Sequence, residues 1–189
     1  VLHTMNAFKM MGVKIHDNKE SITIFGNGLN SLEKPDRDIY LGNSGTSARL
    51  LSGLLASQKF YSKITGDKSL SCRPMKRITE PLKKMGAEIE TRNNCLPLVI
   101  KGKNLKNAEI EIKVPSAQVK SGILLASLNT EGITKIIENK ITRDHTEKML
   151  EAFGANINIK LENKNKIINI MGKKELVSKN IQVPNDLSS

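Results

Sequence analysis

One pattern of helix, glycine and paired strands occurs three times along this chain, and it limits the fold more than any other feature. Each time an apolar helical stretch ends at a glycine, an alternating strand follows, and a polar turn leads to a second strand that ends at another glycine. The segments span residues 12–26, 86–102 and 154–172. Repetition of one unit indicates an architecture built from stacked copies. We expect the first glycine of each segment to cap its helix in the left-handed conformation.

The two later copies also agree in the residues that precede the paired strands. Asn43-Ser44-Gly45 and Pro115-Ser116-Ala117-Gln118 each lead into an apolar stretch that is typical of a buried helix. An arginine, Arg73 or Arg143, then precedes a second helix. The strands expected between the two helices are 60–67 and 133–138. The unit is therefore β-α-β-α-β-β, and the predicted fold class is α/β, with repeated units packed around buried helices.

Local patterns place the remaining elements. Apolar residues from Met75 to Met85 recur at helical spacing, and Pro74 suits the first turn of that helix. Asp144 and Glu147 have the spacing of a capping box for a helix at 146–153. Short β runs are expected at Glu88–Thr91, Leu98–Ile100, Asn156–Leu161 and Ile167–Ile170.

The repeat also leads us to expect an incomplete domain. The chain opens on Val1 within what is expected to be the second helix of a copy, and Val183-Pro184 near its end resembles Val114-Pro115 at the start of another. Two full copies and the tail of one are therefore expected, in a single domain over residues 1–189 that lacks its N-terminal part.

Composition excludes some classes and favours others. No apolar run approaches the roughly 18 residues of a membrane span. Cys72 and Cys95 form no disulfide framework, which favours a reducing compartment such as the cytoplasm, and neither cysteine has a partner at metal-ligand spacing. We therefore expect no metal, no cofactor and no membrane partner.

The formal net charge of +11 raises the question of nucleic-acid binding. Lysine accounts for 24 of the 30 basic residues, these lysines are spread through turns, and aromatic residues make up only 3% of the chain. Solvated lysine faces and steering of small anions are therefore expected rather than nucleic-acid binding. Arg49, Arg73 and Arg143 are the better guide, because each lies near a helix start, where backbone N–H groups and an arginine fork can hold an anion.

These motifs, in this order, resemble those of the 5-enolpyruvylshikimate-3-phosphate (EPSP) synthase family over nearly all of the chain. The motifs are Gly42-Asn43-Ser44-Gly45-Thr46-Ser47-Ala48-Arg49, Gly66-Asp67-Lys68-Ser69-Leu70-Ser71-Cys72-Arg73-Pro74-Met75, Pro115-Ser116-Ala117-Gln118-Val119-Lys120-Ser121 and Thr142-Arg143-Asp144-His145-Thr146-Glu147. Members of that family join shikimate 3-phosphate to phosphoenolpyruvate and release phosphate, on the pathway to aromatic amino acids. The resemblance implies two domains of three copies each, of which this chain would be most of one.

The resemblance also implies a role for individual residues. Ser116, Ala117 and Gln118 would lie at the shikimate 3-phosphate site, with Gln118 reaching toward phosphoenolpyruvate as well. Arg143 would face shikimate 3-phosphate. Arg73 would clamp phosphoenolpyruvate, and Gly45 would form part of the pocket floor.

The same resemblance places the catalytic groups outside this chain. The acid–base carboxylates, a lysine and further arginines would come from the second domain, and a Lys-Ser segment would precede Val1. The isolated chain is therefore expected to bind shikimate 3-phosphate weakly and to catalyse nothing, while the full-length enzyme would be a monomer. Gly45 lacks the methyl group that an alanine would supply in glyphosate-tolerant relatives, so a glyphosate-sensitive enzyme is expected.

Other interpretations remain open at this stage. Gly42 and Gly45 could serve only a tight turn, Ser116 only a helix cap, Arg73 only the surface and Arg49 only internal structure. The sister family that transfers enolpyruvyl to UDP-N-acetylglucosamine shares the fold, although residues 67–71 contain no reactive cysteine. A basic RNA-binding module is a third alternative, because RNA 3′-phosphate cyclases use related folding units.

Overall fold

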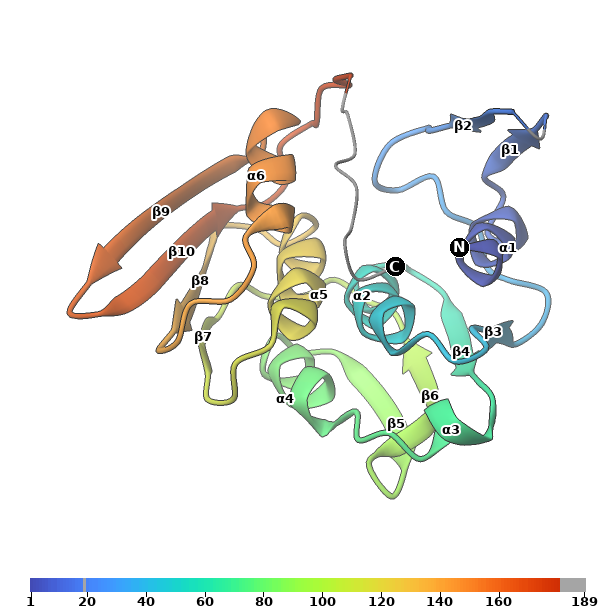
Figure 1. Cartoon of the computed structure of the whole chain (residues 1–189), viewed down its shortest axis with the longest axis horizontal. Helices are drawn as coiled ribbons and strands as arrows, with labels where there is room; N and C mark the ends of the chain where they lie inside the picture. Colours follow the sequence, from blue (N-terminus) through green and yellow to red (C-terminus); the bar gives the residue numbers. More distant parts are fainter. Residues whose placement is uncertain (19, 181–189) are drawn as a thin grey trace.

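The two later sequence copies fold alike in the computed structural model, which describes residues 1–18 and 20–180 (Figure 1). The middle copy consists of β3 (Ile39–Tyr40), α2 (Gly45–Ala56), β4 (Tyr61–Thr65), α3 (Lys68–Ser71), α4 (Lys76–Lys84), β5 (Glu88–Arg92) and β6 (Cys95–Lys101). The last copy consists of β7 (Glu109–Ile112), α5 (Ala117–Ser127), β8 (Ile133–Glu138), α6 (His145–Ala152), β9 (Asn156–Glu162) and β10 (Asn165–Met171). The first segment supplies α1 (Leu2–Met10), β1 (Lys14–Asp17) and β2 (Ile22–Phe25). The predicted β-α-β-α-β-β unit is confirmed, with the short α3 as an addition in the middle copy.

Strand order within the sheets repeats as well. One sheet has the order β3-β4-β6-β5 and the other the order β7-β8-β10-β9. In each sheet the first two strands run parallel and the last strands form antiparallel pairs, so the two copies have the same topology. Parallel neighbours need a crossover, and α2 and α5 are the crossover helices. The α/β fold class is thereby confirmed.

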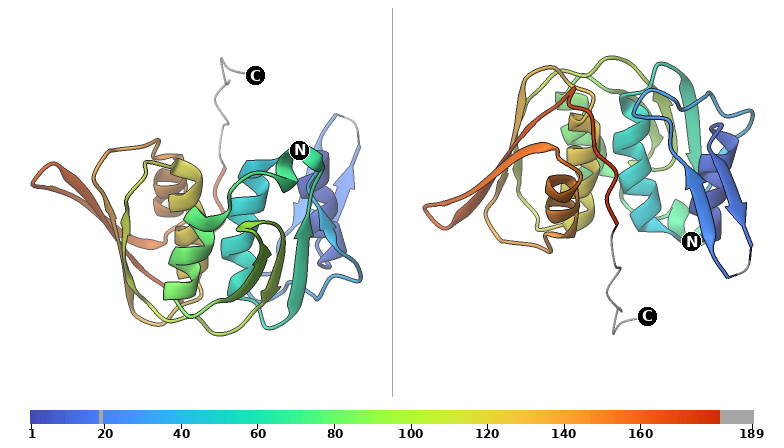
Figure 2. Two further views of the ribbon diagram at one scale, coloured as in Figure 1. Left: turned by 90° about the horizontal axis from the view of Figure 1, so that it is seen from below. Right: turned by 90° about the horizontal axis from the view of Figure 1, so that it is seen from above.

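The core lies where these crossover helices meet. Figure 2 shows α2 and α5 side by side between the two sheets. They can approach this closely because glycines lie at the crossing: a β-carbon on Gly53 would collide with the carbonyl oxygen of Gly122. A β-carbon on Gly122 would lie 2.7 Å from the carbonyl oxygen of Arg49. The close crossing brings the starts of both helices to one end of the molecule.

Residues at the helix ends follow the sequence signals. Ser44 and Ser116 cap α2 and α5, and each hydroxyl accepts a hydrogen bond from the backbone N–H three residues later. Gly12, Gly86 and Gly154 follow α1, α4 and α6 with φ of 83°, 93° and 79°. The predicted left-handed glycine caps are confirmed.

The predicted capping box at the start of α6 is wrong. The Asp144 side chain makes no capping hydrogen bond, and α6 begins at His145. Asp144 instead accepts a hydrogen bond from Lys148 at 3.0 Å, which holds the pKa of the Asp144 carboxyl below its ordinary value. Glu147 is fully buried, where it pairs with Lys120. The prediction from the capping-box spacing was wrong because Glu147 pairs with Lys120, which is distant in the sequence and therefore does not enter the local pattern.

Two further expectations need correction. Pro74 lies outside the first turn, since α4 begins at Lys76 after Met75 as its cap. The interpretation of the lysines as solvated side chains does not hold for Lys120 and Lys166, which are both buried.

The expected start of another copy at Val183-Pro184 lies outside the described residues. In the described part of the chain, no helix is long and apolar enough to cross a membrane.

Candidate functional site

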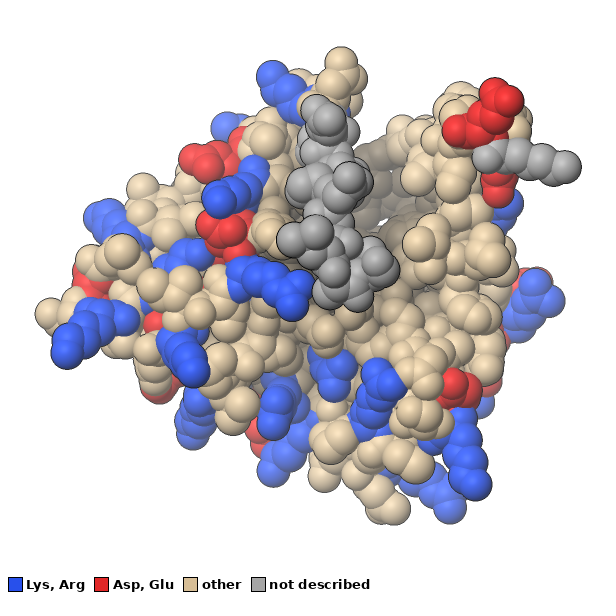
Figure 3. Space-filling view, in the orientation of Figure 1, with Lys and Arg blue, Asp and Glu red and all other residues tan. Residues whose placement is uncertain are grey.

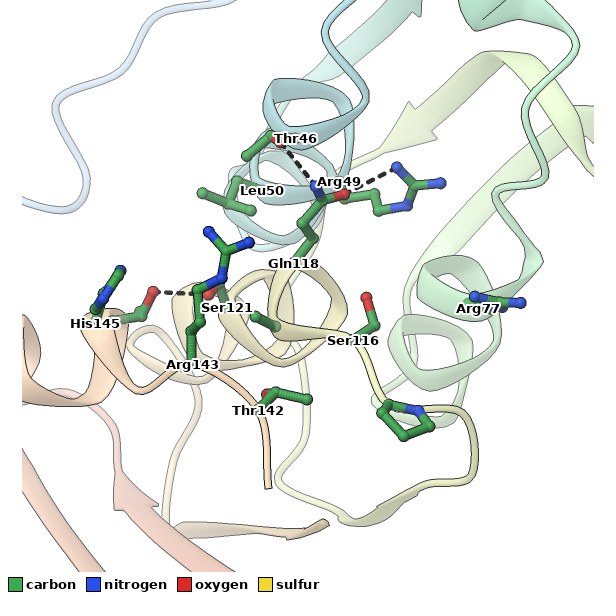
Figure 4. A pocket seen from close by; sticks show the side chains of 13 residues that line it. Thr46, Arg49, Leu50, Arg77, Ser116, Gln118, Ser121, Thr142, Arg143 and His145 are labelled. Atoms are coloured by element: carbon green, nitrogen blue, oxygen red, sulfur yellow. Dashed lines mark hydrogen bonds between the residues drawn. The ribbon is translucent and has the colours of Figure 1, made fainter. Parts of the chain in front are cut away.

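A pocket of about 720 Å³ opens where the starts of α2 and α5 meet the segment that leads into α6 (Figure 4). α2 contributes Thr46, Arg49 and Leu50, and α4 contributes Arg77. The remaining lining residues come from the start of α5 and the start of α6, and are Pro115, Ser116, Ala117, Gln118, Ser121, Thr142, Arg143, His145 and Thr146. Of the predicted site residues, Ser116, Ala117, Gln118 and Arg143 are therefore brought together in one cavity.

The first turn of α5 forms one wall of this pocket. Ser116 is the N-cap, and its hydroxyl accepts from the backbone N–H of Val119 at 3.3 Å. Ser116 therefore is a helix cap and also lines the cavity, so the two interpretations of this residue are compatible. The first N–H groups of a helix have no partner within it and form a binding site for an anion. Ala117 and Gln118 carry such groups at the pocket wall.

Arg49 ties the two helix starts together. Its guanidinium donates to Oε1 of Gln118 at 3.0 Å, to the carbonyl of Gly45 at 3.1 Å and to the carbonyl of Pro74 at 3.2 Å. Gln118 in turn donates to the hydroxyl of Thr46 at 2.8 Å. Burial lowers the pKa of the Arg49 guanidinium from its ordinary value, and the nearby charges of Arg73 and Arg77 lower it further. Arg49 thus has a structural role, as the sequence suggested, and its charge also borders the cavity.

Arg73 and Gly45 lie beside the pocket rather than in its lining. A β-carbon on Gly45 would lie 2.8 Å from Nη1 of Arg49 and 3.1 Å from Nη1 of Arg73, so both guanidinium groups approach this glycine. Arg73 also donates to Oδ1 of Asn43. Asn43 donates to Asp67 at 3.0 Å, and Asp67 caps α3 by accepting from the N–H of Leu70 at 2.7 Å. Arg73 is therefore oriented by a chain of polar contacts at the edge of the site.

Arg143 enters the cavity from the opposite wall. It precedes α6, and in Figure 4 its side chain extends from that segment toward α2 and the start of α5. The first turn of α6 is hydrogen-bonded to α5, since the hydroxyls of Thr146 and Ser121 lie 2.6 Å apart. His145 is exposed at the pocket rim. Arginines from α2, α4 and the segment before α6 thus converge on one space.

Sequence reasoning missed several lining residues. Arg77 lies in the first turn of α4, and no local pattern indicated that this turn borders the pocket. Thr46 follows the predicted Gly45 directly. Ser121 and Thr142 belong to the motifs of the family resemblance, which assigned no role to either, and both line the cavity.

The charge of this site favours an anion. Arg49, Arg77 and Arg143 line the pocket, and no Asp or Glu from residues 1–18 and 20–180 does so. Elsewhere on the visible face, Lys and Arg are scattered rather than gathered in one stripe (Figure 3). Within the same residues, no group of three His, Cys, Asp or Glu side chains is placed to hold a metal ion. The arrangement is suited to binding phosphate or carboxylate groups through guanidinium forks and helix N–H groups.

Known proteins are similar to this chain in sequence and in fold. The sequence model of EPSP synthase (3-phosphoshikimate 1-carboxyvinyltransferase) matches residues 1–189. The 3-phosphoshikimate 1-carboxyvinyltransferase of Ruthia magnifica subsp. Calyptogena magnifica is 53% identical over 100% of this chain and 42% of its own length. The protein of the same name from Bacillus cereus (strain B4264) is 48% identical over 100% of this chain and 43% of its own length.

Solved structures agree. EPSP synthase from Acinetobacter baumannii matches with a TM-score of 0.90 at 50% identity, over 99% of this chain and 42% of that one. The chain therefore spans less than half the length of the curated relatives it matches. The family match along the whole sequence, together with the shared fold, shows that the chain belongs to the EPSP synthase family.

Proposed function

We propose that this chain supplies the shikimate 3-phosphate side of the active site of a 3-phosphoshikimate 1-carboxyvinyltransferase. The observation that carries the proposal is the pocket at the start of α5, which Arg49, Arg77 and Arg143 line and which no carboxylate from the described residues enters. A substrate that carries a phosphate and a carboxylate is negatively charged, and its charge complements the positive charge of this pocket. Membership of the EPSP synthase family supports the same substrate class.

In this proposal the first turn of α5 and Arg143 hold shikimate 3-phosphate. The Ser116 hydroxyl and the N–H groups of Ala117 and Gln118 bind phosphate oxygens, because a helix N-terminus combines free donors with a favourable dipole. Arg143 approaches from the opposite wall and adds a guanidinium fork. Both groups line the same cavity, which is large enough for a substrate of this size.

Phosphoenolpyruvate would bind next to this substrate, beside Gly45. The guanidinium groups of Arg49 and Arg73 both approach Gly45, because no side chain keeps them away, and together they present two positive charges to an anion beside it. Gln118, held between Thr46 and Arg49, lies on the boundary between the two substrates. The chemical contribution of these residues is positioning and charge compensation, since two anions must be brought together against their repulsion.

Proton transfer would depend on acid–base groups that do not line this pocket. We expect the 189-residue chain to bind shikimate 3-phosphate weakly and to release no phosphate from phosphoenolpyruvate, because the family resemblance assigns the acid–base carboxylates to the other domain. The proposal also includes a cytoplasmic, monomeric full-length enzyme that handles small molecules rather than nucleic acid.

A calorimetric comparison of ligands tests this proposal. Shikimate 3-phosphate should bind the chain more tightly than shikimate, because only the phosphorylated compound engages the α5 N-terminus. UDP-N-acetylglucosamine and a short single-stranded RNA serve as the competing classes. Preferential binding of UDP-N-acetylglucosamine, or RNA binding with a steep dependence on salt concentration, would contradict the proposal.

A further inference from the structure

A buried ion cluster lies behind the pocket wall. It consists of Lys120, Glu138, Glu147 and Lys166, whose side chains are 8% exposed or less. Lys120 Nζ lies 2.9 Å from Glu138 Oε2 and 2.7 Å from Glu147 Oε1, and Lys166 Nζ lies 2.9 Å from the same Glu147 oxygen. The cluster joins four elements, because its residues lie in α5, β8, α6 and β10.

The charges of this cluster balance. The positive charges of Lys120 and Lys166 match the negative charges of Glu138 and Glu147, so the group as a whole is neutral. Burying charged groups is costly, and close pairing with good hydrogen bonds is needed to compensate. Such a cluster fixes the relative positions of the elements that carry it, because moving any one of them would leave a buried charge unpaired.

Thr142 connects this cluster to the substrate pocket. Its hydroxyl donates to Glu138 Oε1 at 2.6 Å, on the carboxylate whose other oxygen binds Lys120. Thr142 directly precedes Arg143. Both lie in the segment between β8 and α6, which has no helix or strand. Lys120 also lies two residues after Gln118 on α5. One buried cluster is thus bonded to both walls of the pocket.

We propose that the buried ion cluster, acting through the Thr142–Glu138 hydrogen bond, positions Arg143 against the start of α5. This inference rests on the proposed function only for the identity of the anion that Arg143 meets. Glu138 is a positioning residue, because it does not line the pocket and acts through Thr142. Thr142 itself lines the pocket, and the role assigned to it here is the hydrogen bond that it donates to Glu138. Without the hydrogen bond, the exposed Arg143 would lose the anchor next to it and sample orientations that face away from α5.

The variant Thr142→Val tests the inference because it removes the hydroxyl and keeps the shape of the side chain. Thr134→Val is the matched control: Thr134 is fully buried in β8, and its hydroxyl has no partner among the described residues. We expect Thr142→Val to weaken shikimate 3-phosphate binding about tenfold, the effect of one hydrogen bond to a charged group. We expect Thr134→Val to bind like the unaltered chain, and Thr142→Ser to restore binding.

A second measurement separates this inference from the proposed function. NMR order parameters of residues 139–144, recorded without ligand, should fall in Thr142→Val and stay unchanged in Thr134→Val. Glu138→Gln should lower them as well, since it weakens the contact with Lys120. If the unaltered chain does not bind shikimate 3-phosphate, the proposed function fails, while the order parameters still decide the positioning role. Unchanged order parameters in Thr142→Val, or equal losses in both valine variants, would overturn the inference.

Discussion

At the scale of single residues, Gly45 controls the approach of two guanidinium groups. An added β-carbon would meet only the flexible ends of Arg49 and Arg73, at 2.8 and 3.1 Å, so we expect Gly45→Ala to shift both groups at little cost in stability. The free energy of unfolding should change by no more than about 0.5 kcal/mol, while phosphoenolpyruvate binding in the presence of shikimate 3-phosphate weakens. Urea unfolding and calorimetry measure the two effects. Unfolding of the variant, or unchanged phosphoenolpyruvate affinity, would contradict this account.

Asp67 makes the stability of the fold dependent on pH. The N–H of Leu70 holds the pKa of this carboxyl below its ordinary value of 3.8, with smaller help from Asn43 and Arg73. A lowered pKa means that ionised Asp67 stabilises the fold above that ordinary value, and that the contribution is lost as pH falls through the lowered pKa. Asp67→Asn should therefore be less stable than the unaltered chain near neutral pH, and the difference should shrink in acid. Urea midpoints at several pH values test this, and a difference independent of pH would contradict it.

At the scale of whole elements, the crossing of α2 and α5 depends on glycine. A methyl group on Gly53 would meet the backbone of Gly122, which cannot rotate away as a side chain can. We expect Gly53→Ala to lower the free energy of unfolding by about 1–3 kcal/mol or more. Gly26→Ala is the control, because no atom lies within 4 Å of its added carbon. Equal urea midpoints for the two variants would disprove the close packing of these helices.

The ion cluster makes a second prediction at this scale. Lys120→Met leaves Glu138 and Glu147 buried with only Lys166 to balance them. Removing one partner from a buried ion group costs roughly 3–5 kcal/mol. Lys76→Met is the control, because Lys76 pairs with Glu80 while largely exposed to water, and exposed pairs contribute little. Thermal unfolding of both variants measures the contrast. A Lys120→Met variant as stable as Lys76→Met would show that the cluster contributes no stability.

Elements with a local signature could be predicted from the sequence, and those with distant partners could not. Helix caps such as Ser116 and the glycines after α1, α4 and α6 depend on a few neighbouring residues, so their patterns were sufficient. The positions of Lys120 and Glu147 depend on strands far along the chain. Local spacing suggested a capping-box role for Glu147, and composition suggested that lysines in general are solvated. Both expectations were wrong here, because Glu147 and Lys120 are buried as an ion pair. Arg77 was missed for the same reason, since only the packing of α4 brings it to the pocket.

At the scale of the whole molecule, the repeat accounts for the location of the site. Each crossover helix begins with a cap serine after the first strand of its copy, and the glycine crossing places these two beginnings next to each other. The arginines that precede or begin the following helices then surround the same space. The candidate site thus arises from duplicated elements packed at one end, rather than from a motif confined to one loop.

Shikimate 3-phosphate titrated into the 15N-labelled chain, with the backbone amide shifts recorded, is the most direct test of this account. We expect saturable shifts centred on Ser116, Ala117, Gln118 and Arg143, with smaller ones at Thr46 and Arg49, and none at exposed lysines on the hairpin β9–β10. Shifts scattered over surface lysines, or a saturable response away from the start of α5, would contradict the central claim that this pocket binds the phosphorylated substrate.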